Sequence, residues 1–274
     1  MGARRPGATA AGSVLSESGT GARRSLLHGR RRGRKLRPGQ QRLLDGLLPR
    51  LRFELPPGRT FDPSCLFDRP VAAVWLEIGF GGGEHLAELA ARLPDHGFVG
   101  CEVFENGVVK LLAEVDRLRL GNLRLLIDDA RPLIGALAEA SLGRVFILFP
   151  DPWPKLRHHK RRLVSRATLD TLARAMADSA ELRLATDDVD YLRWMLERLT
   201  AHDAFEWLAR RSQDWRERPV DWPPTRYEQK ALAAGRRPTF LRFRRRPRAV
   251  PAAAAGLSLA ADAEMTIFRK KEVP

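Results

Sequence analysis

The sequence predicts an α/β fold in which a doubly wound, mostly parallel seven-stranded sheet carries helices on both faces. Three observations support this prediction. Short apolar runs alternate with segments that have the apolar spacing of amphipathic helices. The runs are continuously apolar, as in parallel strands that are buried on both faces. Most of them end at glycine or at an acidic residue, where a turn can begin.

Each expected element has its own pattern in the chain. Residues 71–78 are an apolar run that ends in glycines, and the next segment spaces Leu86, Leu89 and Leu93 along one face of a helix. A second strand and helix follow in the same way, and three later apolar runs end in acids. In chain order we expect strands at 71–78, 98–103, 123–127, 145–149 and 181–185, and helices at 84–93, 108–118 and 192–199.

Two more strands are expected towards the C-terminus, at residues 205–208 and 239–243. The second of them alternates apolar and cationic side chains, which is typical of an edge strand that faces solvent. On this interpretation residues 1–35 are a disordered basic arm, residues 36–246 are one folded domain, and residues 247–274 are a flexible extension. The basic block at residues 30–35 is either a solvated tail or an arm that lies on phosphates.

The composition restricts the class of protein. A net charge of +15 over 274 residues favours a polyanionic partner, although a bias towards arginine codons also produces such a surplus. Cys65 and Cys101 are the only cysteines, and their spacing fits neither a disulfide framework nor a zinc site. We therefore expect a cytoplasmic protein without a metal. No apolar run approaches the roughly 20 residues that span a bilayer, so no membrane association is expected. An organellar transit peptide at the N-terminus is the alternative.

A glycine loop follows the first expected strand. Gly79, Gly81 and Gly83 stand at alternate positions, and Glu84 occupies the place of the third glycine in a dinucleotide fingerprint. A carboxylate at a helix N-terminus repels a pyrophosphate, which argues against a nicotinamide-dependent oxidoreductase. S-adenosylmethionine has no phosphate and carries an ammonium and a sulfonium, so it suits this acidic loop. The alternative is a tight structural turn.

Acidic residues at the strand ends suit the same cofactor, because strand ends of a parallel sheet line one crevice. We expect Glu77 near the methionine ammonium or the main-chain amides, Glu102 at the ribose hydroxyls and Asp129 at the adenine amino group. Each of these acids can instead cap a helix, and Asp129 directly before Ala130 is the strongest case.

One segment, residues 149–162, combines three features that chemistry on a nucleic-acid base needs. Its sequence is FPDPWPKLRHHKRR. Asp151 supplies a carboxylate at a strand end, Trp153 a flat ring between prolines, and the cations a surface for phosphates. Trp153 either stacks on a base or braces the loop. The two histidines lack partners at metal-ligand spacing, so contact with phosphate is the better interpretation.

Three segments resemble the tRNA (guanine-N7)-methyltransferase family: residues 149–162, residues 185–191 (ATDDVDY) and residues 225–231 (TRYEQKA). The resemblance extends over roughly residues 30–245, and the segment 149–162 is its most specific part. It implies a Rossmann-like class I methyltransferase fold. The implied reaction transfers a methyl group from S-adenosylmethionine to N7 of a guanine in the variable loop of tRNA. The implied partner is tRNA, and the protein is expected to be a monomer or a homodimer.

The resemblance also implies roles for individual residues, with Asp151 as the catalytic residue. It places the cofactor at Glu77, Gly79, Gly81, Gly83, Glu102, Asp129 and Asp151, the substrate at Lys155, Asp187, Thr225, Arg226, Tyr227 and Glu228, and the RNA at Arg157, His158, His159, Lys160, Arg161 and Arg162. Two positions depart from the family pattern. Gly82 stands where methionine is expected, and Asp128 stands where glycine is common, so the adenine contact is either Asp128 or Asp129.

The chemistry of guanine is consistent with this assignment. N7 has an available lone pair, so no proton leaves before it attacks the methyl group, and the reaction creates positive charge on the base. A carboxylate that accepts from the guanine N1–H and amino group stabilises that charge, and Asp151 is assigned this role. A tRNA-binding protein without catalysis and a methyltransferase for another RNA are the alternatives. Thr225 and Glu228 also have the spacing of a capping box, and Asp187 or Asp188 can cap the helix that follows.

Overall fold

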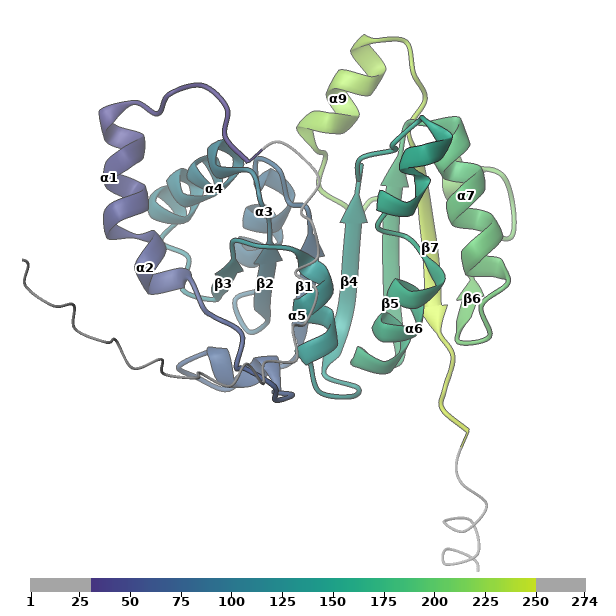
Figure 1. Ribbon diagram of the computed structural model, residues 1–274, viewed down its shortest axis with the longest axis horizontal. Coiled ribbons are helices and arrows are strands. Elements are labelled where there is room, and N and C mark those ends of the chain that lie inside the picture. Colours follow the sequence, from purple (N-terminus) through teal and green to yellow (C-terminus); the bar gives the residue numbers. More distant parts are fainter. Residues whose placement is uncertain (1–30, 250–274) are drawn as a thin grey trace, which may run out of the picture.

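The computed structural model describes residues 31–249, and these fold around one seven-stranded sheet (Figure 1). The strand order is β3-β2-β1-β4-β5-β7-β6. The strands are β1 (Val74–Ile78), β2 (Gly97–Cys101), β3 (Leu123–Leu126), β4 (Leu142–Leu148), β5 (Met176–Thr186), β6 (Phe205–Trp207) and β7 (Thr239–Arg245). The first five are parallel, whereas β7 runs antiparallel to both β5 and β6. The predicted fold class is confirmed.

Helices cover both faces of the sheet, and each face has its own apolar core. One core combines α3 (Glu84–Arg92) and α4 (Glu105–Leu118) with Phe98 and Phe146. The other combines α5 (Ala130–Ala136), α6 (Arg166–Ala175) and α7 (Val189–Thr200) with Leu76 and Ile147. The remaining helices are α1 (Pro38–Gly46), α2 (Leu48–Leu51), α8 (Gln213–Arg216) and α9 (Arg226–Ala233), with the short 3-10 turns η1 (Pro63–Leu66) and η2 (Leu156–Arg161).

The strand order indicates where a ligand-binding crevice lies. The chain order reverses between β1 and β4, which are hydrogen-bonded neighbours in the centre of the sheet. At such a switch point the loops that leave the two strands diverge, one towards each face, and open a crevice at the carboxyl edge. The glycine loop leaves β1 there, and the segment from Phe149 onwards leaves β4.

Two details of the predicted sheet were wrong. β7 is internal, because the short strand β6 pairs with its outer side. Its cationic side chains pair with acids of neighbouring strands, as Arg242 does with Glu181 at 2.8 Å, so the alternation does not mark an edge. β5 begins at Met176 rather than at residue 181. Ser179 adopts a left-handed conformation and the register with β4 shifts there, so the first part of the strand is irregular and lacks the continuous apolar pattern.

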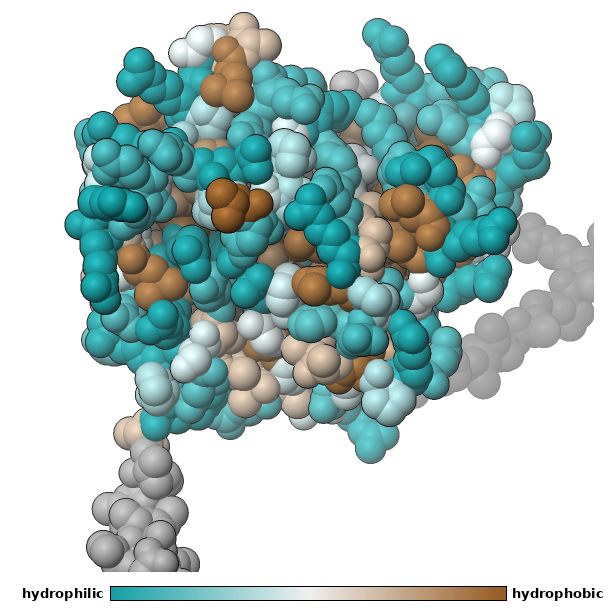
Figure 2. Space-filling view, turned by 180° about the vertical axis from the view of Figure 1, so that it is seen from behind, coloured by the Kyte–Doolittle hydropathy of each residue, from teal (hydrophilic) through white to brown (hydrophobic). Residues whose placement is uncertain are grey.

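The predicted terminal arm and extension lie mostly outside the described residues. Residues 31–34 are described, and they make defined contacts with the first turn of α4. No helix within residues 31–249 is long and apolar enough to cross a membrane. The face of the molecule turned away in Figure 1 is mostly hydrophilic, and its hydrophobic residues form several separate spots (Figure 2).

Candidate active site

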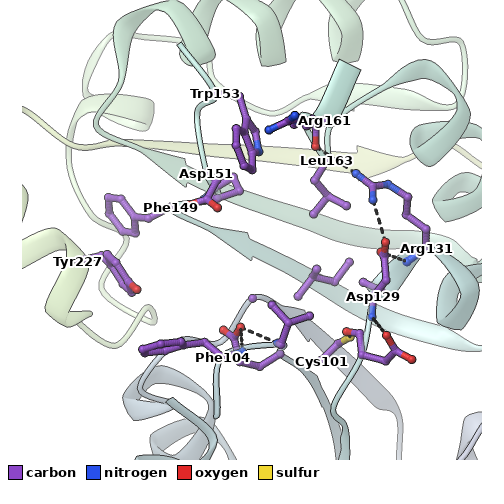
Figure 3. A pocket seen from close by; sticks show the side chains of 17 residues that line it. Cys101, Phe104, Asp129, Arg131, Phe149, Asp151, Trp153, Arg161, Leu163 and Tyr227 are labelled. Carbon is purple, nitrogen blue, oxygen red and sulfur yellow. Dashed lines mark hydrogen bonds and ion pairs between the residues drawn. The ribbon is translucent and has the colours of Figure 1, made fainter. Parts of the chain in front are cut away.

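A cavity of about 380 Å³ opens at the carboxyl ends of β1, β2, β3 and β4 (Figure 3). This volume suits a small-molecule ligand of ordinary size. Acidic residues from three loops line it, together with aromatic rings on two sides: Glu102, Asp128, Asp129, Asp151, Phe104, Phe149, Trp153 and Tyr227. The sheet thus brings together acids that are far apart in the sequence, whereas Glu77 and Asp187, which also stand at strand ends, are not part of this lining.

The three alternate glycines of the loop each adopt a left-handed backbone conformation. Gly79, Gly81 and Gly83 have φ of 74°, 57° and 76°, a region that side chains other than glycine's strongly disfavour. A Cβ at Gly83 would also lie 2.6 Å from the Cβ of Leu111 in α4. The glycines are therefore required by the turn itself, whatever ligand lies against the main chain.

Glu102 holds this glycine loop in place through hydrogen bonds to main-chain N–H groups. Its Oε2 accepts a 2.8 Å hydrogen bond from the N–H of Gly81, and its Oε1 accepts from the N–H groups of Val103 and Phe104 at 2.7 and 2.9 Å. Burial raises the pKa of Glu102, and the three N–H groups oppose that shift. The side chain therefore combines a structural role with a position in the wall of the cavity.

Glu77 does not line the large cavity. It is buried beneath the glycine loop, where its Oε2 lies 2.7 Å from Nδ1 of His85, a residue of α3 that is also buried. The pair borders a second, much smaller cavity between the glycine loop and the start of α9. His85 was not predicted, although its position in the first turn of an amphipathic helix was a signal. The expected contact of Glu77 with the methionine ammonium stays a prediction.

Asp129 caps a helix, which was the alternative that the sequence left open. Its Oδ1 accepts from the N–H of Arg131 at 2.9 Å at the start of α5, and its Oδ2 pairs with the Arg131 guanidinium at 2.9 Å. Asp128 is more exposed and accepts from the N–H of Asp129 through Oδ1. Both acids line the cavity, and Arg131 was not predicted.

Asp151 stands at the mouth of the cavity between two strained residues. Phe149 and Trp153 have φ of 51° and 46°, which is rare for aromatic residues and is typical of functional sites. Within residues 31–249 the Asp151 carboxylate makes no hydrogen bond or ion pair. Burial raises its pKa. The carboxylate is thus an acceptor that is exposed to solvent on one side, only partly desolvated, and without a partner among the described residues.

Trp153 forms one wall of the cavity rather than part of the core. The Arg161 guanidinium lies 5.0 Å from the centre of its ring, and the His158 ring meets it edge-on at 5.9 Å. Figure 3 shows Trp153 and Arg161 together on one side of the cavity, with Phe104 on the opposite side. The geometry leaves both interpretations of Trp153 open, because the ring packs in the loop and also faces the cavity.

Arg162, which was predicted to contact RNA, is buried in this structure, unlike the cations around it. Its side chain is only 1% exposed, and its Nε donates to the carbonyl oxygen of Pro152 at 2.7 Å. The guanidinium also pairs with Asp190 and lies over the rings of two α7 residues, Tyr191 and Trp194. Arg162 therefore anchors the 149–162 segment to α7. The cations that remain exposed are Lys155, Arg157 and Lys160, and His158, His159 and Arg161 are half-buried.

The segment 225–228 begins α9 as a capped helix. Thr225 Oγ1 accepts from the N–H of Glu228 at 3.0 Å, and Glu228 pairs with Arg218 at 3.1 Å. The N–H of Arg226 donates to Glu84 at 2.8 Å, which ties α9 to the start of α3. The capping alternative is thus realised, and the substrate roles of Thr225 and Glu228 stay predictions.

Tyr227 extends from α9 to the cavity, where its ring stacks on Phe149 with 6.4 Å between centroids and an angle of 19° between the planes. Asp187 pairs instead with Arg236 at 2.6 Å, and its neighbour Asp188 caps α7. The structure therefore brings Asp151, Tyr227 and Glu102 to one cavity. It leaves Asp187 and the exposed Lys155 outside the cavity lining.

Known proteins resemble this chain over most of its length. A family model described as "Putative methyltransferase" matches residues 71–241. A protein of Rhodospirillum rubrum named tRNA (guanine-N(7)-)-methyltransferase is 54% identical over 225 residues, which are 81% of this chain and 88% of that protein. A protein of the same name from Paramagnetospirillum magneticum is 48% identical and covers 86% of this chain and 100% of its own length.

This chain belongs to the tRNA (guanine-N7)-methyltransferase family. The predicted resemblance is therefore confirmed. Among solved structures, a 16S rRNA methyltransferase has a TM-score of 0.47 and 16% identity, over 65% of this chain and 89% of that one. The class I arrangement of the fold is established by the strand order and the antiparallel β7. No group of three or more His, Cys, Asp or Glu residues that could hold a metal occurs in the described part of the chain.

Proposed function

We propose that this protein transfers the methyl group of S-adenosylmethionine to N7 of a guanine in the variable loop of tRNA. The observation that carries the proposal is the position of Asp151, an acid without a protein partner among the described residues, at the mouth of an acid-lined cavity. The names of close relatives support the same reaction and the same substrate. Cytoplasmic tRNA is the substrate, and the free thiols of Cys65 and Cys101 suit that reducing compartment.

The lining of the cavity fits the methyl donor. S-adenosylmethionine supplies an electrophilic methyl group on a sulfonium, and it carries positive charge but no phosphate. Glu102 accepts one N–H bond at Oε2 and two at Oε1, so Oε2 keeps an acceptor position for a ribose hydroxyl while the side chain holds the glycine loop. Asp128 suits the adenine amino group better than Asp129 does, because Arg131 engages both oxygens of Asp129. The Arg131 guanidinium is neutralised by Asp129 and therefore does not repel the donor.

Asp151 has the chemistry to hold guanine. A carboxylate that is partly desolvated and lacks hydrogen-bond donors gains more from a new donor than a fully solvated carboxylate does. The N1–H and the amino group of guanine are two such donors on one edge, and adenine does not offer this pair. As N7 takes up the methyl group, positive charge spreads over the base and the bond to the carboxylate strengthens. Asp151 thus selects the base and stabilises the transition state, and it removes no proton.

The aromatic rings complete the binding of the base in this proposal. Trp153 and the stacked pair of Phe149 and Tyr227 flank Asp151 on two sides. A flat base between such rings is held by stacking and is kept from water, so its reacting nitrogen has a fixed direction. Lys155, Arg157 and Lys160 are exposed in the segment that follows Asp151, and they suit the flanking phosphates.

The test uses purified full-length protein and tRNA from cells that lack 7-methylguanosine. Labelled methyl donor and each of two RNAs, total tRNA and ribosomal RNA, are incubated with the protein, and the nucleosides are analysed by mass spectrometry. The proposal predicts 7-methylguanosine in tRNA. Label that appears only in ribosomal RNA favours a methyltransferase for another RNA. Tight tRNA binding without any methylated nucleoside favours the non-catalytic alternative.

A further inference from the structure

The basic strip of residues 31–35 is held against the protein by its backbone while its cations face solvent. Arg31, Arg32, Arg34 and Lys35 are exposed, whereas Gly33 between them is half-buried. Fixing the main chain of each residue costs conformational entropy. A tail that serves only to be solvated is therefore not expected to be held in this way. The arrangement therefore indicates a strip that is prepared for an anionic partner.

Asn106 holds the strip in place through two hydrogen bonds. Its Oδ1 accepts from the N–H of Gly33 at 2.6 Å, and its Nδ2 donates to the carbonyl oxygen of Arg34 at 2.8 Å. One amide side chain thus pairs with the main chain of the strip as a neighbouring strand would. A Cβ at Gly33 would lie 2.6 Å from Oδ1 of Asn106 and 3.0 Å from Cζ of Phe104, so only glycine allows this approach.

The strip in turn completes the N-terminus of α4. No side chain caps this helix, and its first free N–H, that of Glu105, donates instead to the carbonyl oxygen of Arg31 at 2.9 Å. Arg32 forms an ion pair of 3.0 Å with Glu105, and both partners are accessible to water, so this pair contributes little stability. Figure 1 shows the segment that leads into α1 beside α4.

The same turn of α4 forms part of the methyl-donor site. Phe104 lines the cavity, and Gly107 lies against the glycine loop, where a Cβ would meet the carbonyl oxygen of Gly81 at 2.1 Å. The strip therefore lies on the rim beside Phe104. Trp153 and Arg161 lie on the opposite side of the cavity from Phe104 (Figure 3), and the exposed cations Lys155, Arg157 and Lys160 belong to the same segment as these two residues.

We propose that residues 31–35 are a second phosphate-binding strip for the tRNA substrate, and that Asn106 is its positioning residue. The two basic rims then hold the backbone on either side of the target nucleotide, while the base lies between them at Asp151. Asn106 touches neither cofactor nor RNA in this arrangement. It acts by fixing the direction of the neighbouring arginines. This inference rests on the proposed function, because it takes tRNA as the partner.

The test compares two substitutions that release the strip from Asn106 without changing the charge of the strip. Asn106→Ala removes both hydrogen bonds, and Gly33→Ala introduces the close contacts described above. Each variant is expected to raise the KM for tRNA roughly tenfold, because two hydrogen bonds are lost. The kcat and the Kd for S-adenosylmethionine are expected to stay near the wild-type values. The salt dependence of tRNA binding is expected to become shallower. Gly39→Ala is the matched control, since a Cβ there meets only an arginine tip at 3.6 Å.

A double-mutant cycle separates positioning from structural damage. Arg34→Gln raises the KM for tRNA when the strip is seated, but it should have little further effect in the Asn106→Ala background. Additive effects of the two changes, or a wild-type KM in Asn106→Ala, would overturn the inference. A parallel loss of methyl-donor affinity in Asn106→Ala would equally overturn it, because it points to a structural role of α4. Wild-type protein that makes no 7-methylguanosine contradicts the proposed function instead.

Discussion

The N–H of Gly81 donates to Oε2 of Glu102 across 2.8 Å, and this hydrogen bond joins the glycine loop after β1 to the acid after β2. The two residues come from adjacent parallel strands, which end at the same edge of the sheet. The acid thereby fixes the loop in the conformation that lines the cavity. The shape of the cavity consequently depends on one carboxylate, and under the proposed function so does binding of the methyl donor.

Glu102→Gln should weaken binding of S-adenosylmethionine. The amide keeps the size of the side chain, but it loses the charge and one of the acceptor oxygens that three N–H groups now share. We expect the Kd to rise about 10- to 100-fold, as for the loss of hydrogen bonds to a charged group. Titration calorimetry measures this change. Glu88→Gln, in an exposed pair on α3, is the control and should leave the Kd unchanged.

Arg162 and Lys160 should behave in opposite ways, although they are two residues apart in one basic run. Arg162→Met removes the donor to Pro152 and the partner of Asp190, and should lower the free energy of unfolding by about 2 to 4 kcal/mol. Lys160→Met should change it by less than about 0.5 kcal/mol but weaken tRNA binding. Denaturant unfolding and tRNA titration distinguish the two. Equal stability of both variants would contradict the anchoring role of Arg162.

The ring of Tyr227 should matter more than its hydroxyl. Tyr227→Phe keeps the stack on Phe149, so kcat/KM for tRNA is expected to stay within about twofold of wild type. Tyr227→Ala removes the stack and one wall of the cavity, and should lower kcat/KM roughly tenfold. Steady-state kinetics at saturating methyl donor measure both. A Phe variant as impaired as the Ala variant would show that the hydroxyl carries the function.

The raised pKa of Asp151 predicts the acid limb of the pH–rate profile. Burial disfavours the carboxylate, so its pKa lies above the ordinary value of 3.8, and the form that accepts from guanine is lost as the pH falls through this raised pKa. The rate should therefore decline at a higher pH than an unperturbed aspartate would cause. Single-turnover rates at saturating donor test this, and the limb should disappear in Asp151→Asn.

Much of the fold was predictable because the strands of a parallel sheet are buried on both faces and read as continuous apolar runs. The ends of these runs also located the glycine loop and the acids. The helices α5 and α6 were not predicted. α5 is short and contains Pro132 and Gly135, which weaken its pattern, and α6 has only a narrow apolar face.

Side-chain partners in space were less predictable. Nothing in the run of cations distinguishes Arg162 from Lys160, because the rings of Tyr191 and Trp194 that receive Arg162 belong to a helix farther along the chain. His85 was overlooked although its partner Glu77 is only eight residues away, because the glycine loop between them is what brings the two side chains together. The left-handed conformations of Phe149 and Trp153 are imposed by tertiary structure against local preference.

The central claim is that the Asp151 carboxylate holds guanine and offsets the charge that develops on it. Single-turnover methyl transfer to tRNA by Asp151→Asn, with donor and tRNA both saturating, tests this claim most directly. We expect the rate to fall about 100- to 1,000-fold, as when a transition-state contact is removed, while the affinities for donor and tRNA change little. A rate within a few-fold of wild type would contradict the account.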